Sequence, residues 1–252
     1  MRVVVIGGSG NAGAAIVRAL GRRGAQAVPV SRSGKAIAGA PGAKADIVSG
    51  DGLDAALEDA DVIVDASNSR NPLDLKPFTI GARNVVAAAE RAGVHRAVLL
   101  SILGVDRSKL QYHRKKHEQE LTYLGSSLEV AVVRASQFHE WSVDFFEAGA
   151  AVGAIPVFLG GRLQPVDVAE VAELVADEAT SPSGQQIIDF AGPQVRVSRD
   201  LARAWQTATG ARGLIVNGPF PPTMLDYLRS GANLTEERKG KVSFEEWLAR
   251  RR

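Results

Sequence analysis

Tyr112 and Lys116 lie four positions apart on a stretch that is predicted to be helical, so their side chains share one face, one turn apart. Such a pair can move a proton. The pKa of a tyrosine, ordinarily about 10, must fall by roughly three units for the phenol to act near neutrality, which corresponds to about 4 kcal/mol. A nearby lysine cation can supply much of this stabilisation of the phenolate. Ser101 ends the strand predicted before this helix, where its hydroxyl can polarise a carbonyl or orient Tyr112. We therefore expect Ser101, Tyr112 and Lys116 to be catalytic.

A glycine-rich turn follows the first predicted strand, Val3 to Ile6, and opens the next predicted helix. A turn in this context is typical of a pyrophosphate site, because the helix start offers backbone donors and a positive dipole end. Gly7 would permit the tight turn, Gly10 the approach of a phosphate, and Gly13 the packing of helix against strand. The alternative is an ordinary flexible turn. The predicted phosphate-binding residues are Gly7, Gly8, Ser9, Gly10, Asn11, Ala12 and Gly13.

The end of the second predicted strand indicates which cofactor ribose the chain accepts. An acidic residue there accepts from a free 2′-hydroxyl, whereas a basic residue pairs with a 2′-phosphate. The sequence here is Ser31-Arg32-Ser33, which favours NADP(H) over NAD(H), although a solvated loop arginine is the alternative. Asp51 follows the third predicted strand, and either binds the adenine amine or caps a short helix. Lys116 is also positioned to hold ribose hydroxyls.

Short β-branched runs alternate with helical stretches, which predicts an α/β fold with a doubly wound parallel sheet of the Rossmann type. We expect one domain spanning 1–252, with a small irregular C-terminal substrate lobe built mainly from about 137–165 and 190–252. The expected strands are Val3–Ile6, Gln26–Val30, Lys44–Val48, Val62–Asp65, Ala97–Ser101, Val130–Arg134 and Gln186–Phe190. The expected helices are Ala12–Arg23, Leu53–Leu57, Ile80–Ala92, Leu110–Leu124, Ala169–Glu178, Arg199–Thr209 and a terminal helix that a capping box of Ser243 and Glu246 begins.

The composition is that of an ordinary globular protein, with 45% hydrophobic and 23% charged residues among 252. A formal charge of +2 does not demand nucleic acid binding, and no apolar stretch is long enough to span a bilayer. The absence of cysteine excludes disulfides and thiolate chemistry, and the scattered histidines predict no metal site. The first strand begins at once, leaving no room for a signal peptide, so we expect a cytoplasmic protein.

These features together resemble the short-chain dehydrogenase/reductase superfamily, and within it the atypical NmrA-like NAD(P)-binding branch. The stretches Leu99–Asp106, Tyr112–Glu120, Val133–Glu140 and Val166–Ala169 are similar to that branch. The resemblance implies that Ala66, Ser67 and Asn68 run alongside the adenosine, and that Gln137 and Phe138 lie near the nicotinamide. One departure is the short interval between Ser101 and Tyr112, where many reductases of the superfamily have a longer loop.

The expected function is NADPH-dependent hydride transfer to a small carbonyl or quinone-like substrate. The alternative from another class is a non-catalytic NADP(H) sensor of the NmrA type that binds a protein partner. A weaker alternative is an NAD-dependent enzyme resembling epimerases or dehydratases. A homodimer is equally open at this point. All of these functions need the same phosphate site, so the glycine turn does not separate them.

Overall fold

The computed structural model describes residues 1–69, 71 and 73–251. Eight strands form one sheet in the order β12-β9-β6-β5-β4-β1-β2-β3. The β1 strand pairs in parallel with both β2 and β4, and the β2–β3, β4–β5 and β9–β12 pairs are also parallel. The order β3-β2-β1-β4-β5-β6 is that of dinucleotide-binding folds and confirms the predicted fold class. The strands are β1 (Arg2–Ile6), β2 (Gln26–Ser31), β3 (Ala43–Lys44), β4 (Val62–Asp65), β5 (Arg96–Ile102), β6 (Glu129–Ala135), β9 (Ile187–Ala191) and β12 (Arg238–Lys239).

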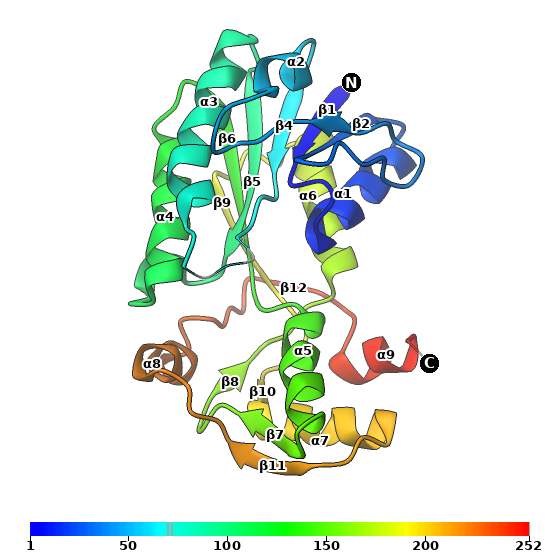
Figure 1. Cartoon of the computed structure of the whole chain (residues 1–252), viewed down its shortest axis with the longest axis vertical. Helices are drawn as coiled ribbons and strands as arrows, with labels where there is room; N and C mark the ends of the chain where they lie inside the picture. The colour runs from blue at the N-terminus through cyan, green and yellow to red at the C-terminus, as the bar shows by residue number, and fades with distance from the viewer. Residues whose placement is uncertain (70, 72, 252) are drawn as a thin grey trace. The chain divides into compact units, whose positions relative to one another are not determined.

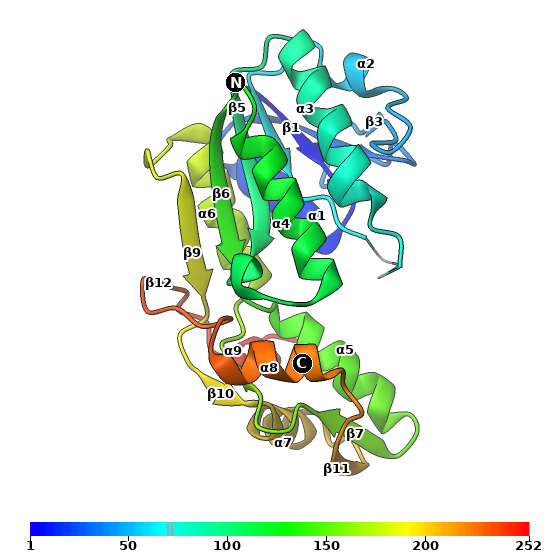
Figure 2. The ribbon, with the colours of Figure 1, turned by 90° about the vertical axis from the view of Figure 1, so that its left-hand side faces the viewer.

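Helices cover both faces of this sheet, as parallel strands require. On one face lie α1 (Asn11–Arg22) and α6 (Val168–Thr180), and on the other lie α3 (Ala82–Arg91) and α4 (Gln111–Leu124) (Figure 1 and Figure 2). The short helix α2 (Leu53–Leu57) packs against α3. The central strands are almost wholly apolar because both of their faces are covered, and Val3 to Val5 of β1 have no exposed surface.

The chain folds into two compact units. The first consists of Met1–Ser101, Arg114–Val133 and Val168–Ile188, and the second of Ile102–His113, Arg134–Asp167 and Asp189–Arg252. The expected substrate lobe falls within the second unit; that the chain is one domain stays a prediction. The further elements of the second unit are α5 (His139–Ala150), β7 (Ala154–Val157), β8 (Arg162–Leu163), β10 (Arg196–Val197), α7 (Ser198–Thr209), β11 (Leu214–Asn217), α8 (Pro222–Ser230) and α9 (Phe244–Ala249).

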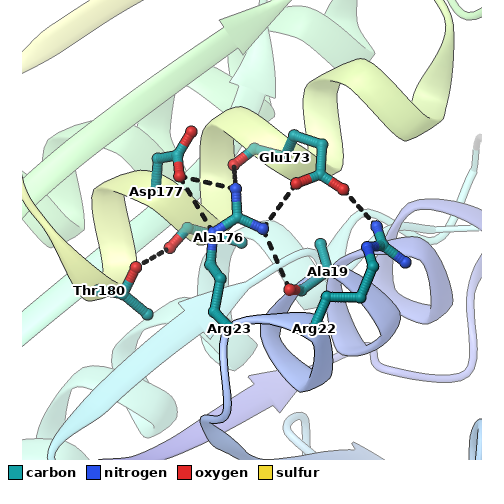
Figure 3. A network of polar contacts seen from close by, with 7 residues as sticks. All are labelled: Ala19, Arg22, Arg23, Glu173, Ala176, Asp177 and Thr180. Carbon is teal, nitrogen blue, oxygen red and sulfur yellow. Dashed lines mark hydrogen bonds and ion pairs between the residues drawn. The ribbon is translucent and has the colours of Figure 1, made fainter.

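Ion pairs fix α6 against α1 within the first unit. The Arg23 guanidinium donates to Glu173 Oε2 at 2.6 Å and to Asp177 Oδ1 at 2.6 Å, and it also reaches the Ala19 carbonyl oxygen (Figure 3). Arg22 bonds the second oxygen of Glu173. The Arg22 guanidinium lowers the pKa of Glu173, so this carboxylate stays charged across the neutral range. These ion pairs hold α6 against α1, the helix that begins at the glycine turn.

Most predicted elements are confirmed within one or two residues, and two are not. The structure gives the predicted bounds of Val62–Asp65 and Leu53–Leu57, and Ser243 and Glu246 form the expected capping box. The third strand is shorter than predicted, because the Asp46 carboxylate accepts from the Val48 and Ser49 amides and turns the chain. The helix predicted at Ile80–Ala92, between β4 and β5, begins with a π-helical turn, Pro77–Gly81, rather than at Ile80.

Candidate functional site

The turn between β1 and α1 is tied to both strands that flank it. The Gly8 amide donates to the carbonyl oxygens of Val5 and Val30, each at 3.1 Å, and the Gly10 amide donates to Gly7 O at 2.9 Å. Gly7 has a φ of +74°, in the left-handed region that favours glycine. The predicted tight turn at Gly7 is therefore present, and its hydrogen bonds connect it to the end of β2.

The glycines of this turn differ in what the space around them requires. A methyl group at Gly7 would lie 2.9 Å from Ala66 O and Ser67 N, and one at Gly13 would lie 2.2 Å from Gly7 O. Backbone atoms thus occupy the space where a side chain would be. At Gly10 such a methyl would meet only Gly7 O, at 3.3 Å. The fold needs glycine at Gly7 and Gly13, whereas the space beside Gly10 stays open for a ligand.

The N-terminus of α1 has the donors and the charge that a pyrophosphate needs. Gly10 is its N-cap, and no side chain of the described residues caps it. The first amides of a helix have no intrahelical partner, so those of Asn11, Ala12 and Gly13 are available to a ligand. The first turn carries no acidic side chain, and both Ser9 and Asn11 are exposed. These features fit the diphosphate of a dinucleotide.

The predicted ribose-binding residues lie at the end of β2. Arg32 is exposed, and its guanidinium makes no hydrogen bond or ion pair with the described part of the chain. Ser31 Oγ and Ser33 Oγ are 3.2 Å apart and flank it. The Val30 carbonyl oxygen accepts from the Gly8 amide, which connects the end of β2 to the phosphate turn. Arg32 comes two residues after Val30.

Asp51 does not cap the short helix α2. The N-cap position belongs to Gly52, which has a φ of +77°, and no side chain caps the helix within the described residues. The Asp51 carboxylate instead accepts from the Ser49 hydroxyl at 2.8 Å. The capping interpretation is wrong, and the adenine contact stays a prediction.

The loop after β4 contains Ala66, Ser67 and Asn68 and packs directly behind the glycine turn. The Ala66 amide continues the pairing with β1 by donating to Ile6 O at 3.0 Å. Ser67 is buried, and its amide donates to Asp65 Oδ1 at 2.7 Å. Asn68 is exposed and accepts from the Ser69 amide at 2.8 Å. The structure thus brings this loop and the phosphate turn together.

Lys116 reaches the same loop from α4. Its ammonium donates to Ser67 O at 3.3 Å and lies 5.0 Å from the centre of the Phe78 ring, which the π-helical turn places there. Burial lowers the pKa of Lys116 to about 8, against the opposing attraction of the Asp65 and Glu120 carboxylates. Lys116 is therefore mostly charged at neutral pH but close to titrating.

The other predicted catalytic and nicotinamide residues have these positions. Ser101 lies near the end of β5, and its hydroxyl is buried without a hydrogen-bond partner among the described residues. Tyr112 is half-buried in the first turn of α4, one turn before Lys116. In the second unit, Gln137 carries a buried side-chain oxygen that has no partner in the described chain, and Phe138 is the N-cap of α5. Their roles stay predictions.

Two side chains of the site were missed by the sequence-based prediction. Gln119 and Tyr123 are fully buried, and each donates to the Asp65 carboxylate. A signal was available, because Lys116, Gln119 and Tyr123 follow a helical i, i+3, i+7 spacing. The charged residues between them obscured it.

No three His, Cys, Asp or Glu side chains within the described ranges are grouped as metal ligands would be. Of the helices that the structure describes, none has the length and apolar character needed to cross a membrane.

Comparison with known proteins gives a family and a set of similar folds. The model of a family described as NAD(P)H-binding matches residues 7–182. A search of curated proteins gave no match. The similar structures include an NADPH-dependent quinone oxidoreductase from Escherichia coli complexed with NADPH (18% identity, 98% of this chain and 99% of that chain, TM-score 0.81). Triphenylmethane reductase from Citrobacter sp. complexed with NADP(H) has 15% identity, 99% coverage of both chains and a TM-score of 0.80. A nucleoside-diphosphate-sugar epimerase from Staphylococcus aureus has 13% identity, 98% and 99% coverage and a TM-score of 0.83.

Substitution of two glycines separates the folding requirement from the space for a ligand. Gly13→Ala places a methyl 2.2 Å from Gly7 O, and we expect it to lower the free energy of unfolding by about 2 kcal/mol or more. Gly10→Ala meets only a 3.3 Å contact, and we expect a change within about 1 kcal/mol. Urea denaturation measures both. Equal losses in the two variants would contradict this assignment.

The buried Lys116 ammonium makes stability depend on pH in a known direction. Its pKa is about 8 in the folded chain against 10.5 in the unfolded one, so between these values the unfolded state binds more protons. The free energy of unfolding therefore gains about 3 kcal/mol from this group as pH rises through that window. We expect the difference in unfolding free energy between the wild type and Lys116→Met to shift in favour of the wild type from pH 8 to 10.5. A difference that stays constant or shifts the other way would contradict the burial of the charge.

Proposed function

Because the chain belongs to the NAD(P)H-binding family, we propose that it is an NADPH-dependent oxidoreductase that transfers hydride to a small carbonyl or quinone-like acceptor. The family match confirms the predicted membership of an NAD(P)-binding family. One observation carries the choice of NADPH: the exposed Arg32 guanidinium directly after β2, which has no partner among the described residues and follows the strand end that is bonded to the glycine turn.

Arg32 is suited to the 2′-phosphate that distinguishes NADPH from NADH. A guanidinium presents a planar fork of donors that matches phosphate geometry, and the Ser31 and Ser33 hydroxyls add donors beside it. The amides at the start of α1 would bind the diphosphate of the same molecule. The NADPH and NADP(H) complexes of the similar quinone oxidoreductase and triphenylmethane reductase support this choice.

The proposed chemistry divides the work between the cofactor and three side chains. When bound, NADPH supplies the hydride. Tyr112 donates the proton to the acceptor oxygen, and Lys116, one turn away on α4, holds the ribose and lowers the pKa of the phenol by its positive charge. Ser101 donates its hydrogen bond to the acceptor oxygen, which would give the buried hydroxyl the partner it lacks in the described chain.

Calorimetric titration tests the choice of cofactor. With protein freed of copurified nucleotide, we expect NADPH to bind at least tenfold more tightly than NADH. In Arg32→Ala the Kd for NADPH should rise roughly ten- to hundredfold, the loss of about 1.5–3 kcal/mol expected for charge-assisted hydrogen bonds.

The Kd for NADH is the internal control of this experiment, because NADH has no 2′-phosphate and should be unaffected by Arg32→Ala. Arg18→Ala removes another exposed cation of the same unit and serves as the matched variant. Equal affinity of the wild type for NADPH and NADH would remove the basis for an NADP(H) site.

Turnover in Tyr112→Phe tests the proposed catalytic role. Against a panel of carbonyls and quinones, we expect kcat to fall by roughly 10²- to 10⁴-fold, the usual contribution of a positioned acid. The Kd for NADPH should stay within about twofold of the wild-type value, because the phenol acts on the acceptor oxygen. Retained turnover would exclude Tyr112 as the proton donor.

The same screen addresses the sensor alternative. A sensor needs different affinities for the oxidised and reduced cofactor, because a ligand shifts an equilibrium only by its differential binding. The sensor function would be favoured over the enzyme function by two results together. These are the absence of turnover by the wild type with any acceptor, and unequal affinities for NADPH and NADP⁺.

A further inference from the structure

Three contacts converge on Ser67, in the loop behind the glycine turn. The Ser67 amide donates to Asp65 Oδ1 at 2.7 Å, its hydroxyl lies 3.3 Å from Gln119 Nε2, and its carbonyl oxygen accepts from Lys116. Every polar group of this residue is therefore held, two of them by α4. Such a complete set of bonds fixes the loop in one position.

Asp65 is the centre of this arrangement. Its side chain has no exposed surface, and Oδ2 accepts from Gln119 Nε2 at 2.8 Å and from the Tyr123 hydroxyl at 2.7 Å, while Oδ1 accepts from Ser67. Burial and the nearby carboxylate raise the pKa of Tyr123, so the phenol remains a donor. A buried carboxylate is costly unless hydrogen bonds satisfy it, so each lost donor weakens the whole group.

This hydrogen-bonded group lies directly behind the phosphate turn. The backbone at Ala66 and Ser67 occupies the space beside Gly7, where a methyl would approach to 2.9 Å. If the loop moves, the turn loses the surface against which Gly7 packs. The position of the first α1 amides thus depends on side chains of α4 that need not touch a ligand at Gly7 to Gly13.

We propose that Gln119 and Tyr123 are positioning residues for nucleotide binding: through Asp65 they hold the Ala66–Asn68 loop against Gly7 and keep the phosphate turn in its binding shape. The inference rests on the proposed function for the identity of the nucleotide. It adds that affinity for the phosphate-bearing half depends on two buried residues behind the turn.

Two variants remove the two donors with little change of shape. Tyr123→Phe deletes only the hydroxyl. Gln119→Met deletes both amide donors, and also the Gln119 side-chain oxygen, which is buried without a partner in the described chain. Its removal offsets part of the loss, so this variant keeps the test valid if Tyr123→Phe folds poorly.

Tyr227→Phe is the matched control. Tyr227 is also a buried tyrosine, 4% exposed, and its hydroxyl donates to a backbone oxygen, Leu103 O, at 2.6 Å. It belongs to the second unit and takes no part in the contacts around Asp65. This variant therefore loses a comparable hydrogen bond without disturbing the loop behind the turn.

The probes are NADPH and adenosine 2′,5′-bisphosphate, which carries the ribose phosphate but no nicotinamide. In both test variants we expect the Kd of both probes to rise by the same factor, roughly three- to tenfold, because the competent turn is less populated. Amide hydrogen exchange of residues 7–13 and 66–68, measured without nucleotide, should speed up in both variants and not in Tyr227→Phe.

Unchanged Kd values and exchange rates in both variants, with a wild type that binds NADPH, would overturn the positioning role alone. The same conclusion follows if Tyr227→Phe weakens both probes equally, or if only NADPH loses affinity. A wild type that binds neither probe would overturn the proposed function, and this inference with it.

Discussion

The site depends on one close contact between two backbone segments. In the parallel register of β1 and β4, Ile6 pairs with Asp65, so the residues that follow, Gly7 and Ala66, leave the sheet side by side. They come so close that no side chain fits at Gly7. Glycine is thus required at this position by the neighbouring backbone segment as well as by its own positive φ. The direction of α1, and the aim of its first amides, follows from this contact.

Holding that contact requires charge in the interior of the first unit. Asp65 and Glu120 have no exposed surface, and Lys116 has very little. Ions so buried are costly, and Lys116 shows the cost in its lowered pKa. Hydrogen bonds offset it: Asp65 accepts from three groups, and Glu120 Oε2 lies 3.1 Å from His117 Nδ1. The apolar residues that fill the rest of this core have no such cost.

The sequence predicted the parts of the site that are determined locally. The glycine turn and Arg32 are encoded within a few residues of a strand end, and the strands alternate clearly with helices. The sequence-based prediction missed the hydrogen bond from the Val48 amide to the Asp46 carboxylate, which turns the chain and shortens the third strand. The helical spacing of Gln119 and Tyr123 could place them on one face with Lys116, but their bonds to Asp65 join residues more than fifty positions apart, so local spacing could not identify Asp65 as their partner.

Two polar atoms of the first unit are unpaired in the described chain although the fold buries them. They are Ser101 Oγ at the end of β5 and Gln119 Oε1 beside Asp65. A buried polar atom without a partner costs about 1–3 kcal/mol, so an apolar side chain of the same shape would serve stability better at either position. Both atoms belong to residues near the carboxyl ends of the strands, where ligands bind in open α/β sheets. The rule that buried polar atoms have hydrogen-bond partners is thus broken at positions where a binding site is expected. Such departures from the most stable choice of residue are typical of functional sites.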